Sequence, residues 1–329
     1  MSFDDCKTAL QNSSICVLPT ETVYGLACSA FSQEAVEKVF ALKNRPSSNP
    51  LIVHVLNHNE ASKISYTSKL SEKLAKSFWP GPLTMVLPKK ECIPFKITAG
   101  LNTVAIRSPS HLEFRKMLRS VKLPIAAPSA NKSNKVSPTR YQDVLNEFGN
   151  DCPPLIDGGP CQIGIESTVL DLTTEIPEIL RLGSCSKEDI EGVICCEVKS
   201  PQGNENINDF SSKSKKSPGQ MNKHYAPETP LFIYPSFEKL ISDSFSENSD
   251  IILLPCKDYS IKNSGSKIII HYLSENGDSK EIAQNLYHSL RCLDNFKKDK
   301  IFTSLFPWDN GVLSAVNDRL IRASTACIL

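Results

Sequence analysis

Residues 15–55, ICVLPTETVYGLACSAFSQEAVEKVFALKNRPSSNPLIVHV, carry two strand patterns with a helix pattern between them. Ile15–Leu18 and Leu51–Val55 are short apolar runs next to turn residues, which predicts strands. Ser32–Lys43 predicts a helix, because its apolar residues recur at i, i+3 and i+4 and Ser32 is a favoured N-cap. Strand, helix and strand in this order are typical of an α/β fold.

The same alternation continues toward residue 198. Further strands are predicted at Leu83–Leu87, Thr103–Arg107, Ile125–Ala127, Thr168–Leu172 and Ile179–Leu182. Further helices are predicted at Lys69–Phe78, His111–Arg119 and Arg140–Phe148, and the signature Ser186-x-x-Asp189 predicts another helix start. We therefore expect an α/β domain over residues 1–198.

A polar stretch separates this region from the rest of the chain. Residues 199–217, KSPQGNENINDFSSKSKKS, are nearly free of apolar side chains, so we expect residues 199–230 to form a linker and an interdomain segment. Strand patterns follow at Leu231–Tyr234, Ile251–Leu254 and Lys267–Ile270, and helix patterns at Lys280–Leu293 and Asn317–Ala323. They predict a second, smaller α/β domain over residues 231–329.

Composition narrows the class of protein. The chain has 329 residues, 40% of them hydrophobic and 22% charged, which suits two globular domains. A formal net charge of +1 gives no support to a strongly basic nucleic-acid binder. The 12 cysteines form no CxxC pair, so we interpret them as reduced thiols of a cytoplasmic protein. We find no membrane-spanning run and no secretory or transit signal.

Cations and small polar residues gather at strand ends and in loops. Lys43 and Arg45 follow a helix and can surround a polyphosphate, although they can equally complement the helix dipole. Arg107 and Arg181 end apolar strands, where an unpaired charge is costly, so each needs an anionic partner or a wet cleft. The Ser- and Asn-rich loop over residues 128–139 can donate to phosphate, or can be an ordinary surface loop.

The chain carries no G-x-G-x-x-G fingerprint, no Walker A loop and no nucleophile elbow. The residue types by themselves therefore indicate an anion-binding cleft for a nucleotide, built from these four cations and several Ser/Thr loops.

Seven segments, taken in order, resemble the YrdC-like domain of threonylcarbamoyl-AMP synthases between about Ser13 and Val198. They are PTETVYGL (19–26), KNRPSSNPLIVH (43–54), WPGPLT (79–84), VAIRSP (104–109), APSANKS with SPT (127–133, 137–139), GIESTVLDL (164–172) and ILRLG (179–183). SPGQMNKHYAPETPL (217–231) and NDRLIRAS (317–324) resemble, less closely, the interdomain segment and closing helix of two-domain members. The resemblance implies a twisted mixed sheet with flanking helices, followed by a smaller Rossmann-like α/β domain.

The resemblance also implies an activity. Members of the family convert L-threonine, bicarbonate or CO2 and ATP to threonylcarbamoyl-AMP and pyrophosphate, for the N6-threonylcarbamoyladenosine modification of tRNA. We expect Mg²⁺ to accompany ATP, without an organic prosthetic group, and the product to pass to a tRNA threonylcarbamoyltransferase. Direct binding of tRNA stays open at this point.

Site residues follow from the same resemblance, motif by motif. The residues expected around threonine are Thr22, His54, Arg107, Ala127 and Ser167. The residues expected around ATP are Lys43, Arg45, Asn49, Thr103, Ser129, Asn131, Ser137, Arg181 and Tyr225; the metal ligands are not specified. Tyr225, in the sequence HYAP, would make the interdomain segment a lid, and the C-terminal domain would act as a cover. Asn134 stands where members often have glycine, and asparagine tolerates a positive φ.

Two other functions are less consistent with the sequence. A carbamoyltransferase of the hydrogenase-maturation type also contains a YrdC-like module, but it carries an acylphosphatase-like unit and CxxC zinc motifs that this sequence lacks. A non-catalytic RNA-binding module is disfavoured by the near-neutral charge and by the absence of aromatic RNP-type strips.

Overall fold

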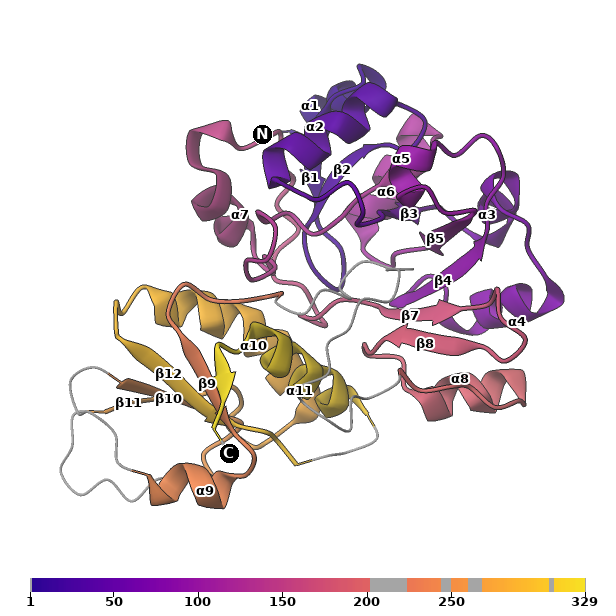
Figure 1. Ribbon diagram of the computed structural model, residues 1–329. Coiled ribbons are helices and arrows are strands. Elements are labelled where there is room, and N and C mark those ends of the chain that lie inside the picture. The colour runs from indigo at the N-terminus through magenta and orange to yellow at the C-terminus, as the bar shows by residue number, and fades with distance from the viewer. Residues whose placement is uncertain (1, 202–223, 244–249, 260–267, 308–310, 329) are drawn as a thin grey trace.

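The computed structural model describes residues 2–201, 224–243, 250–259, 268–307 and 311–328. These residues form two α/β units, each built on its own sheet (Figure 1). The predicted linker over residues 199–217 lies outside the described residues from position 202 onward.

The first unit contains an eight-stranded mixed sheet. Its strands are β1 (Ile15–Leu18), β2 (Gly25–Ser29), β3 (Ile52–His54), β4 (Leu83–Pro88), β5 (Thr103–Arg107), β6 (Ile125–Ala126), β7 (Thr168–Asp171) and β8 (Glu178–Arg181). They lie in the order β1-β2-β6-β3-β5-β4-β7-β8. The pairs β3–β5 and β4–β7 are parallel and the other neighbours are antiparallel, so the predicted mixed sheet is confirmed.

Helices surround this sheet. They are α1 (Phe3–Gln11), α2 (Gln33–Lys43), α3 (His58–Ile64), α4 (Lys69–Phe78), α5 (Phe95–Thr98), α6 (Leu112–Val121), α7 (Tyr141–Phe148), the 3-10 turn η1 (Gly149–Asp151) and α8 (Lys187–Ile194). The helix starts follow the sequence signals: the Ser32 side chain caps α2, and Ser186 forms a capping box with Asp189 at α8.

The two faces of the sheet have different environments. Val104 and Ile106 of β5 belong to the large apolar core of the unit. Ala105 and Arg107 point to the opposite face, because side chains alternate along a strand. That face carries a small apolar patch formed by Ile52, Val86, Ala105, Val169 and Leu180.

The second unit contains a five-stranded parallel sheet. Its strands are β9 (Leu231–Tyr234), β10 (Asp250–Leu254), β11 (Ile269–Tyr272), β12 (Lys300–Ser304) and β13 (Ala326–Cys327), in the order β11-β10-β12-β9-β13. Its helices are α9 (Phe237–Ser242), α10 (Ser279–Asp294) and α11 (Val312–Ala323). A parallel sheet with helical connections confirms the expected smaller α/β domain.

Helices α10 and α11 connect the two units. Both lie between the second sheet and the first unit (Figure 1). Val23, Val136 and Ile165 of the first unit join Leu286 and Tyr287 of α10 in one apolar cluster. The contact is close at Gly164, where a Cβ atom would lie 2.4 Å from the Gln284 Cα and where φ is +77°. Glycine is therefore needed for the loop to approach the helix this closely.

Several helices and strands of the structure were not predicted from the sequence. Gly25–Ser29 is absent from the predicted strands, but it forms β2, whose five residues are all buried. A strand with both faces buried has no alternation of apolar and polar residues to signal it. Residues 19–24, PTETVY, therefore connect the antiparallel strands β1 and β2. The short or weakly patterned elements α1, α3, β12 and β13 were also missed.

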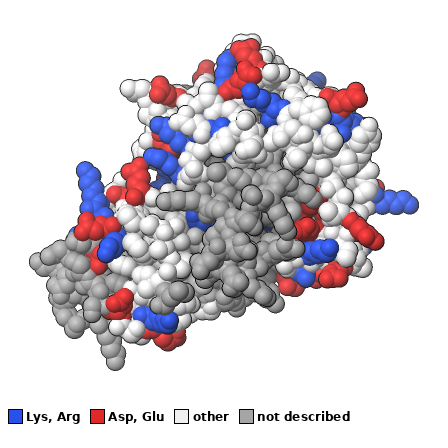
Figure 2. Space-filling view, viewed as in Figure 1, with Lys and Arg blue, Asp and Glu red and all other residues white. Residues whose placement is uncertain are grey.

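The surface gives two further observations. Within the described residues, no helix is long and apolar enough to cross a membrane. On the described part of the face in Figure 2, basic and acidic side chains are interspersed rather than gathered by sign. This distribution gives no support to a broad basic RNA-binding surface on that face.

Candidate active site

A cavity lies beside His54 and Arg107, where β3 and β5 end, and reaches the interdomain segment. Its lining is given by Thr20, Thr22, Val23, Gly25, Arg45, Ile52, His54, Arg107, Ala127, Pro128, Ser129, Glu166, Ser167, Arg181, His224 and Tyr225. All the residues expected around threonine line it. Of those expected around ATP, the lining includes Arg45, Ser129, Arg181 and Tyr225. Lys43, Asn49, Thr103, Asn131 and Ser137 lie outside the cavity wall.

Arg107 is held in place by its neighbours in the first unit. Its Nη2 atom lies 2.7 Å from Oε1 of Glu21, and both side chains are almost fully buried. Its Nη1 atom donates to the Thr22 hydroxyl at 2.8 Å, and its Nε donates to the Gly81 carbonyl at 3.2 Å. Burial acts to raise the pKa of Glu21, but the charge of Arg107, its hydrogen bond and backbone hydrogen bonds together lower that pKa. Glu21 is thus an anionic partner for this strand-end cation.

Arg181 contacts Ser167 twice. Its Nε donates to the Ser167 carbonyl and its Nη2 to the Ser167 hydroxyl, each at 3.0 Å. The same hydroxyl lies 2.7 Å from the Thr84 hydroxyl. Ser167 therefore joins the group of residues expected around threonine to the group expected around ATP.

Arg45 is oriented by backbone carbonyls. Its Nε donates to the Asn49 carbonyl at 3.1 Å and its Nη2 to the Pro50 carbonyl at 2.8 Å. Burial lowers the pKa of the guanidinium to about 9, so Arg45 remains a cation at neutral pH. In the described part of the chain, no carboxylate lies within ion-pair distance of it. The backbone carbonyl of Asn49 thus helps to aim this charge.

His54 lies beside Arg107 and is uncharged at neutral pH. Its Nδ1 lies 3.3 Å from the Ile125 carbonyl, and its ring packs 5.0 Å from that of Phe114. Burial, assisted by the charge of Arg107, lowers the pKa of His54 to about 3. The ring can therefore take part in hydrogen bonds without adding a charge to the cavity.

Lys43 is hydrogen-bonded to the backbone of the loop over residues 128–139. It is 1% exposed, and its Nζ donates to the carbonyls of Ser129 and Asn131. The Asn131 side-chain amide donates to the Lys132 and Lys135 carbonyls, both at 2.8 Å. Asn134 adopts a φ of +71°, which asparagine tolerates, as expected for a position often held by glycine. Lys43 thus contacts the loop that carries Ser129 rather than the cavity itself.

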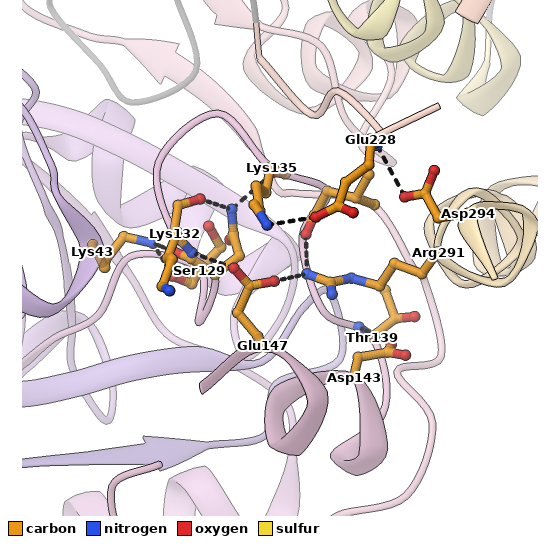
Figure 3. A network of polar contacts seen from close by, with 12 residues as sticks. Lys43, Ser129, Lys132, Lys135, Thr139, Asp143, Glu147, Glu228, Arg291 and Asp294 are labelled. Carbon is orange, nitrogen blue, oxygen red and sulfur yellow. Dashed lines mark hydrogen bonds and ion pairs between the residues drawn. The ribbon is translucent and has the colours of Figure 1, made fainter. Parts of the chain in front are cut away.

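A polar network ties this loop to the second unit (Figure 3). Glu147 of α7 accepts from the Lys132 backbone at 3.0 Å and from Arg291 of α10 at 2.9 Å. Lys135 forms an ion pair with Glu228 at 2.8 Å, and Asp294 of α10 accepts from the Glu228 backbone at 3.0 Å. The loop is therefore held from both units.

Tyr225 closes one side of the cavity. It is 1% exposed and has a φ of +64°, which is unusual for a bulky residue. Its ring stacks on Tyr287 with centroids 5.5 Å apart and lies 5.2 Å from the Arg319 guanidinium carbon. The Ala226 backbone donates to the Asn134 carbonyl at 2.9 Å. These contacts place the HYAP sequence between the two units.

Comparison with known proteins decides the family. The family model described as "Telomere recombination" matches residues 8–183, and the model "Threonylcarbamoyl-AMP synthase, C-terminal domain" matches residues 185–325. The threonylcarbamoyl-AMP synthases of Pyrococcus abyssi and Bacillus subtilis are each 37% identical to this chain. Each alignment covers 96% of this chain, and it covers 92% of the first relative and 90% of the second. The chain belongs to the threonylcarbamoyl-AMP synthase family.

A solved structure of the family agrees with the fold. Sua5 of Pyrococcus abyssi, crystallised with L-threonine, superposes with a TM-score of 0.87 and 35% identity over 99% of this chain and 96% of its own. A variant of that protein with a histidine and a tyrosine changed to alanine superposes with a TM-score of 0.86. Threonylcarbamoyl-AMP synthases are enzymes that form an AMP-linked product, which is a nucleotidyl transfer.

Glu166 lines the cavity but is not among the site residues predicted from the sequence. Glu166 lies inside the quoted GIESTVLDL segment but was not singled out. Its Oε1 accepts from the Ser137 hydroxyl at 2.7 Å, and its Oε2 accepts from Tyr287 at 2.8 Å and from Arg319 at 2.9 Å. Burial acts to raise the pKa of Glu166, but Arg319 and Arg181 lower it to about 2. A carboxylate directly before an apolar strand was the available signal.

The acidic, histidine and cysteine side chains of the described residues can be compared with what a Mg²⁺ site needs. Among the described residues, no group of three or more His, Cys, Asp or Glu side chains could hold a metal. Glu166, which lines the cavity, is engaged by Arg319 and Tyr287. Magnesium commonly binds through substrate phosphates with few protein carboxylates. The donor set fits an ion that enters on the ATP phosphates rather than one held in a protein cage.

Proposed function

We propose that this chain converts L-threonine, bicarbonate or CO2 and ATP to threonylcarbamoyl-AMP and pyrophosphate, which supplies the N6-threonylcarbamoyladenosine modification of tRNA. One observation carries the proposal: a single cavity joins every residue expected around threonine, Arg107 among them, to two further arginines and to Tyr225. Family membership and the L-threonine bound to a relative of 35% identity support the same reaction.

The threonine end of the cavity consists of Thr22, His54, Arg107, Ala127 and Ser167. Arg107 is proposed to bind the threonine carboxylate, since it is the cation that lines this end of the cavity and Glu21 fixes its orientation. The small side chain of Ala127 leaves room for the substrate, and the neutral ring of His54 avoids repulsion of the threonine ammonium group.

The nucleotide end consists of Arg45, Ser129, Glu166, Arg181 and Tyr225. Arg45 and Arg181 are proposed to contact the phosphates of ATP, and Ser129 to donate to them. Lys43, Asn49, Asn131 and Ser137 act on this end through the contacts described above.

The adenosine part of ATP is proposed to lie along the apolar patch around Ile52 and Ala105. Thr103 is an expected ATP contact outside the cavity wall. Because Thr103, Ala105 and Arg107 alternate along β5, all three belong to the same face of the sheet. A nucleotide extended along this face can reach Thr103.

The chemistry needs alignment and charge compensation rather than a protein nucleophile. The threonine amine combines with CO2 to form a carbamate, and a carbamate oxygen attacks the α-phosphorus of ATP while pyrophosphate leaves. Arginines that face both anionic reactants bring them together and offset charge that develops at phosphorus. Mg²⁺, when bound with ATP, supplies further compensation of phosphate charge. Tyr225 excludes water from a product that is prone to hydrolysis.

We further propose three segments: a YrdC-like catalytic domain over residues 1–198, a linker and lid over 199–230, and a C-terminal domain over 231–329. Bicarbonate as the carbon source, transfer of the product to a tRNA threonylcarbamoyltransferase and a cytoplasmic location belong to the same proposal.

The proposal is tested by measuring release of pyrophosphate from ATP by the full-length protein. We expect release only when L-threonine and bicarbonate are both present, with threonylcarbamoyl-AMP detected by mass spectrometry. L-Serine is the matched control, since it lacks only the methyl group. Equal release with serine and threonine, or none with either, would overturn the proposed substrate.

A further inference from the structure

The Glu166 carboxylate is shared between the two units. One oxygen accepts from Ser137 of the first unit, and the other accepts from Tyr287 of α10 and Arg319 of α11. Glu166 is 6% exposed and lines the cavity. A buried carboxylate of this kind is stable only when its partners stay in place.

Arg319 is buried to a degree unusual for arginine. It is 1% exposed and its three nitrogens reach three acceptors: Glu166 at 2.9 Å, Asp318 at 2.6 Å and the Leu182 carbonyl at 2.7 Å. Leu182 follows Arg181 directly in the chain. Arg319 therefore fixes both Glu166 and the backbone next to a proposed phosphate-binding residue.

Tyr225 rests on the same two side chains. Its ring stacks on Tyr287 and lies over the Arg319 guanidinium at 5.2 Å. A cation beneath an aromatic ring is attractive and sets the position of the ring. Three members of the nucleotide end, namely Glu166, Arg181 and Tyr225, thus depend on α10 and α11.

We propose that Tyr287 and Arg319 are positioning residues for ATP, so that the C-terminal domain completes the nucleotide end instead of merely covering it. The inference deepens the proposed function and rests on it. Arg319 keeps Glu166 ionised and aimed at the Ser137 hydroxyl, and both side chains support the ring of Tyr225. The threonine end makes no such contact with α10 or α11 in the described residues.

Tyr287→Phe is the most selective test, because it removes the hydroxyl that donates to Glu166 and keeps the ring that stacks on Tyr225. We expect binding of a non-hydrolysable ATP analogue, followed by calorimetry, to weaken about tenfold, since a hydrogen bond to a charged group is lost. The dissociation constant for L-threonine, measured without nucleotide, should stay within twofold.

Gln284→Ala provides the matched control. Gln284 lies three residues earlier on the same helix and donates to the Cys161 carbonyl of the first unit at 3.1 Å. This variant also removes a contact between the units, but it leaves Glu166 untouched. Its affinities for the ATP analogue and for threonine should both stay within twofold of wild type.

Arg319 supplies a second readout. Arg319→Met removes the cation, so the pKa of Glu166 rises and the affinity for the ATP analogue should fall more steeply from pH 8 to pH 5 than in wild type. Arg319→Lys keeps a charge and should restore part of the loss. If Arg319→Met does not fold, Tyr287→Phe still decides the question.

The inference is overturned if Tyr287→Phe binds the ATP analogue like wild type. It is also overturned if Tyr287→Phe or Gln284→Ala weakens threonine and nucleotide equally, because that is the result of a general loss of docking. Failure of the proposed function looks different: wild type would then release no threonine-dependent pyrophosphate, whatever the variants do to nucleotide affinity.

Discussion

At the threonine end of the cavity, four of the five residues lie within or next to a strand of the first sheet, and the fifth, Thr22, lies in the loop between β1 and β2. The nucleotide end is assembled instead from loops, β8 and the interdomain segment. The charged partners differ in the same way. Arg107 is paired with Glu21 of its own unit, but Glu166 is paired with Arg319, which lies 153 positions away in the other unit. In the proposed division of the cavity, the threonine end is therefore complete within the first unit, and the nucleotide end requires both units.

This difference bears on how the enzyme can work. A binding site fixed by strand ends is preorganised before any substrate arrives. A site that depends on contact between two units can respond to how they dock. The comparison predicts that variants at the two ends will separate threonine binding, nucleotide use and stability.

The largest effect is expected from Arg107→Met. It leaves Glu21 buried without its cation, so the free energy of unfolding should fall by about 3–5 kcal/mol. Urea unfolding followed by circular dichroism measures this loss. The double variant Glu21→Gln/Arg107→Met should recover most of it, and no recovery would show that the ion pair is not the cause.

Arg45→Ala and Arg181→Ala should each lower kcat/KM for ATP by about 100-fold, because each removes a preorganised cation from the proposed phosphate site. The dissociation constant for L-threonine should stay near wild type in Arg45→Ala, whereas Arg181→Ala also removes two hydrogen bonds to Ser167 at the threonine end. Steady-state pyrophosphate release with varied ATP measures the first quantity. A comparable loss of threonine affinity in Arg45→Ala would contradict the separation of the two ends.

Tyr225→Ala should lower kcat about tenfold, because it uncovers the reacting groups to water. Alanine meets the same strain as tyrosine at the φ of +64°, so the variant removes only the ring. Tyr225→Phe is the control, since its ring can keep the contacts with Tyr287 and Arg319. Wild-type turnover in Tyr225→Ala would contradict the role of this residue as a lid.

The smallest effect is the dependence of stability on pH, which involves His54 at the threonine end and His224, the cavity residue next to Tyr225. Burial lowers the pKa of both His54 and His224 to about 3, so both are neutral when folded, while the unfolded chain binds their protons below about pH 6.5. Stability should therefore fall as the pH drops, by about 1 kcal/mol per histidine between pH 6.5 and 5.5. Carboxylates with lowered pKa values, such as Glu166, contribute only at lower pH.

Urea unfolding across this pH range checks the prediction. His54→Gln and His224→Gln should each flatten the dependence of stability on pH by the same amount. If only His54→Gln does so, His224 is already open to water in the folded protein, and the nucleotide end is less closed than its contacts indicate.

The sequence predicted the strands and helices with clear periodicity, including the bounds of β1, β5, β9 and α4. It missed β2, since a strand buried on both faces gives no alternating pattern. The motifs quoted from the sequence contain all five residues of the threonine end, because four of them lie in or next to strands and Thr22 lies in the loop between β1 and β2. Tyr287 and Arg319 could not be found in this way, since their role depends on helix docking between residues far apart in the chain.

The most direct test of the account is titration of L-threonine, without nucleotide, into wild type, Arg107→Lys, Tyr225→Ala and Tyr287→Phe by calorimetry. The account predicts that only Arg107→Lys loses affinity, because threonine is bound by the first unit alone. An equal loss of threonine affinity in the two tyrosine variants would contradict the division of the cavity into a self-contained threonine end and a nucleotide end built by both units.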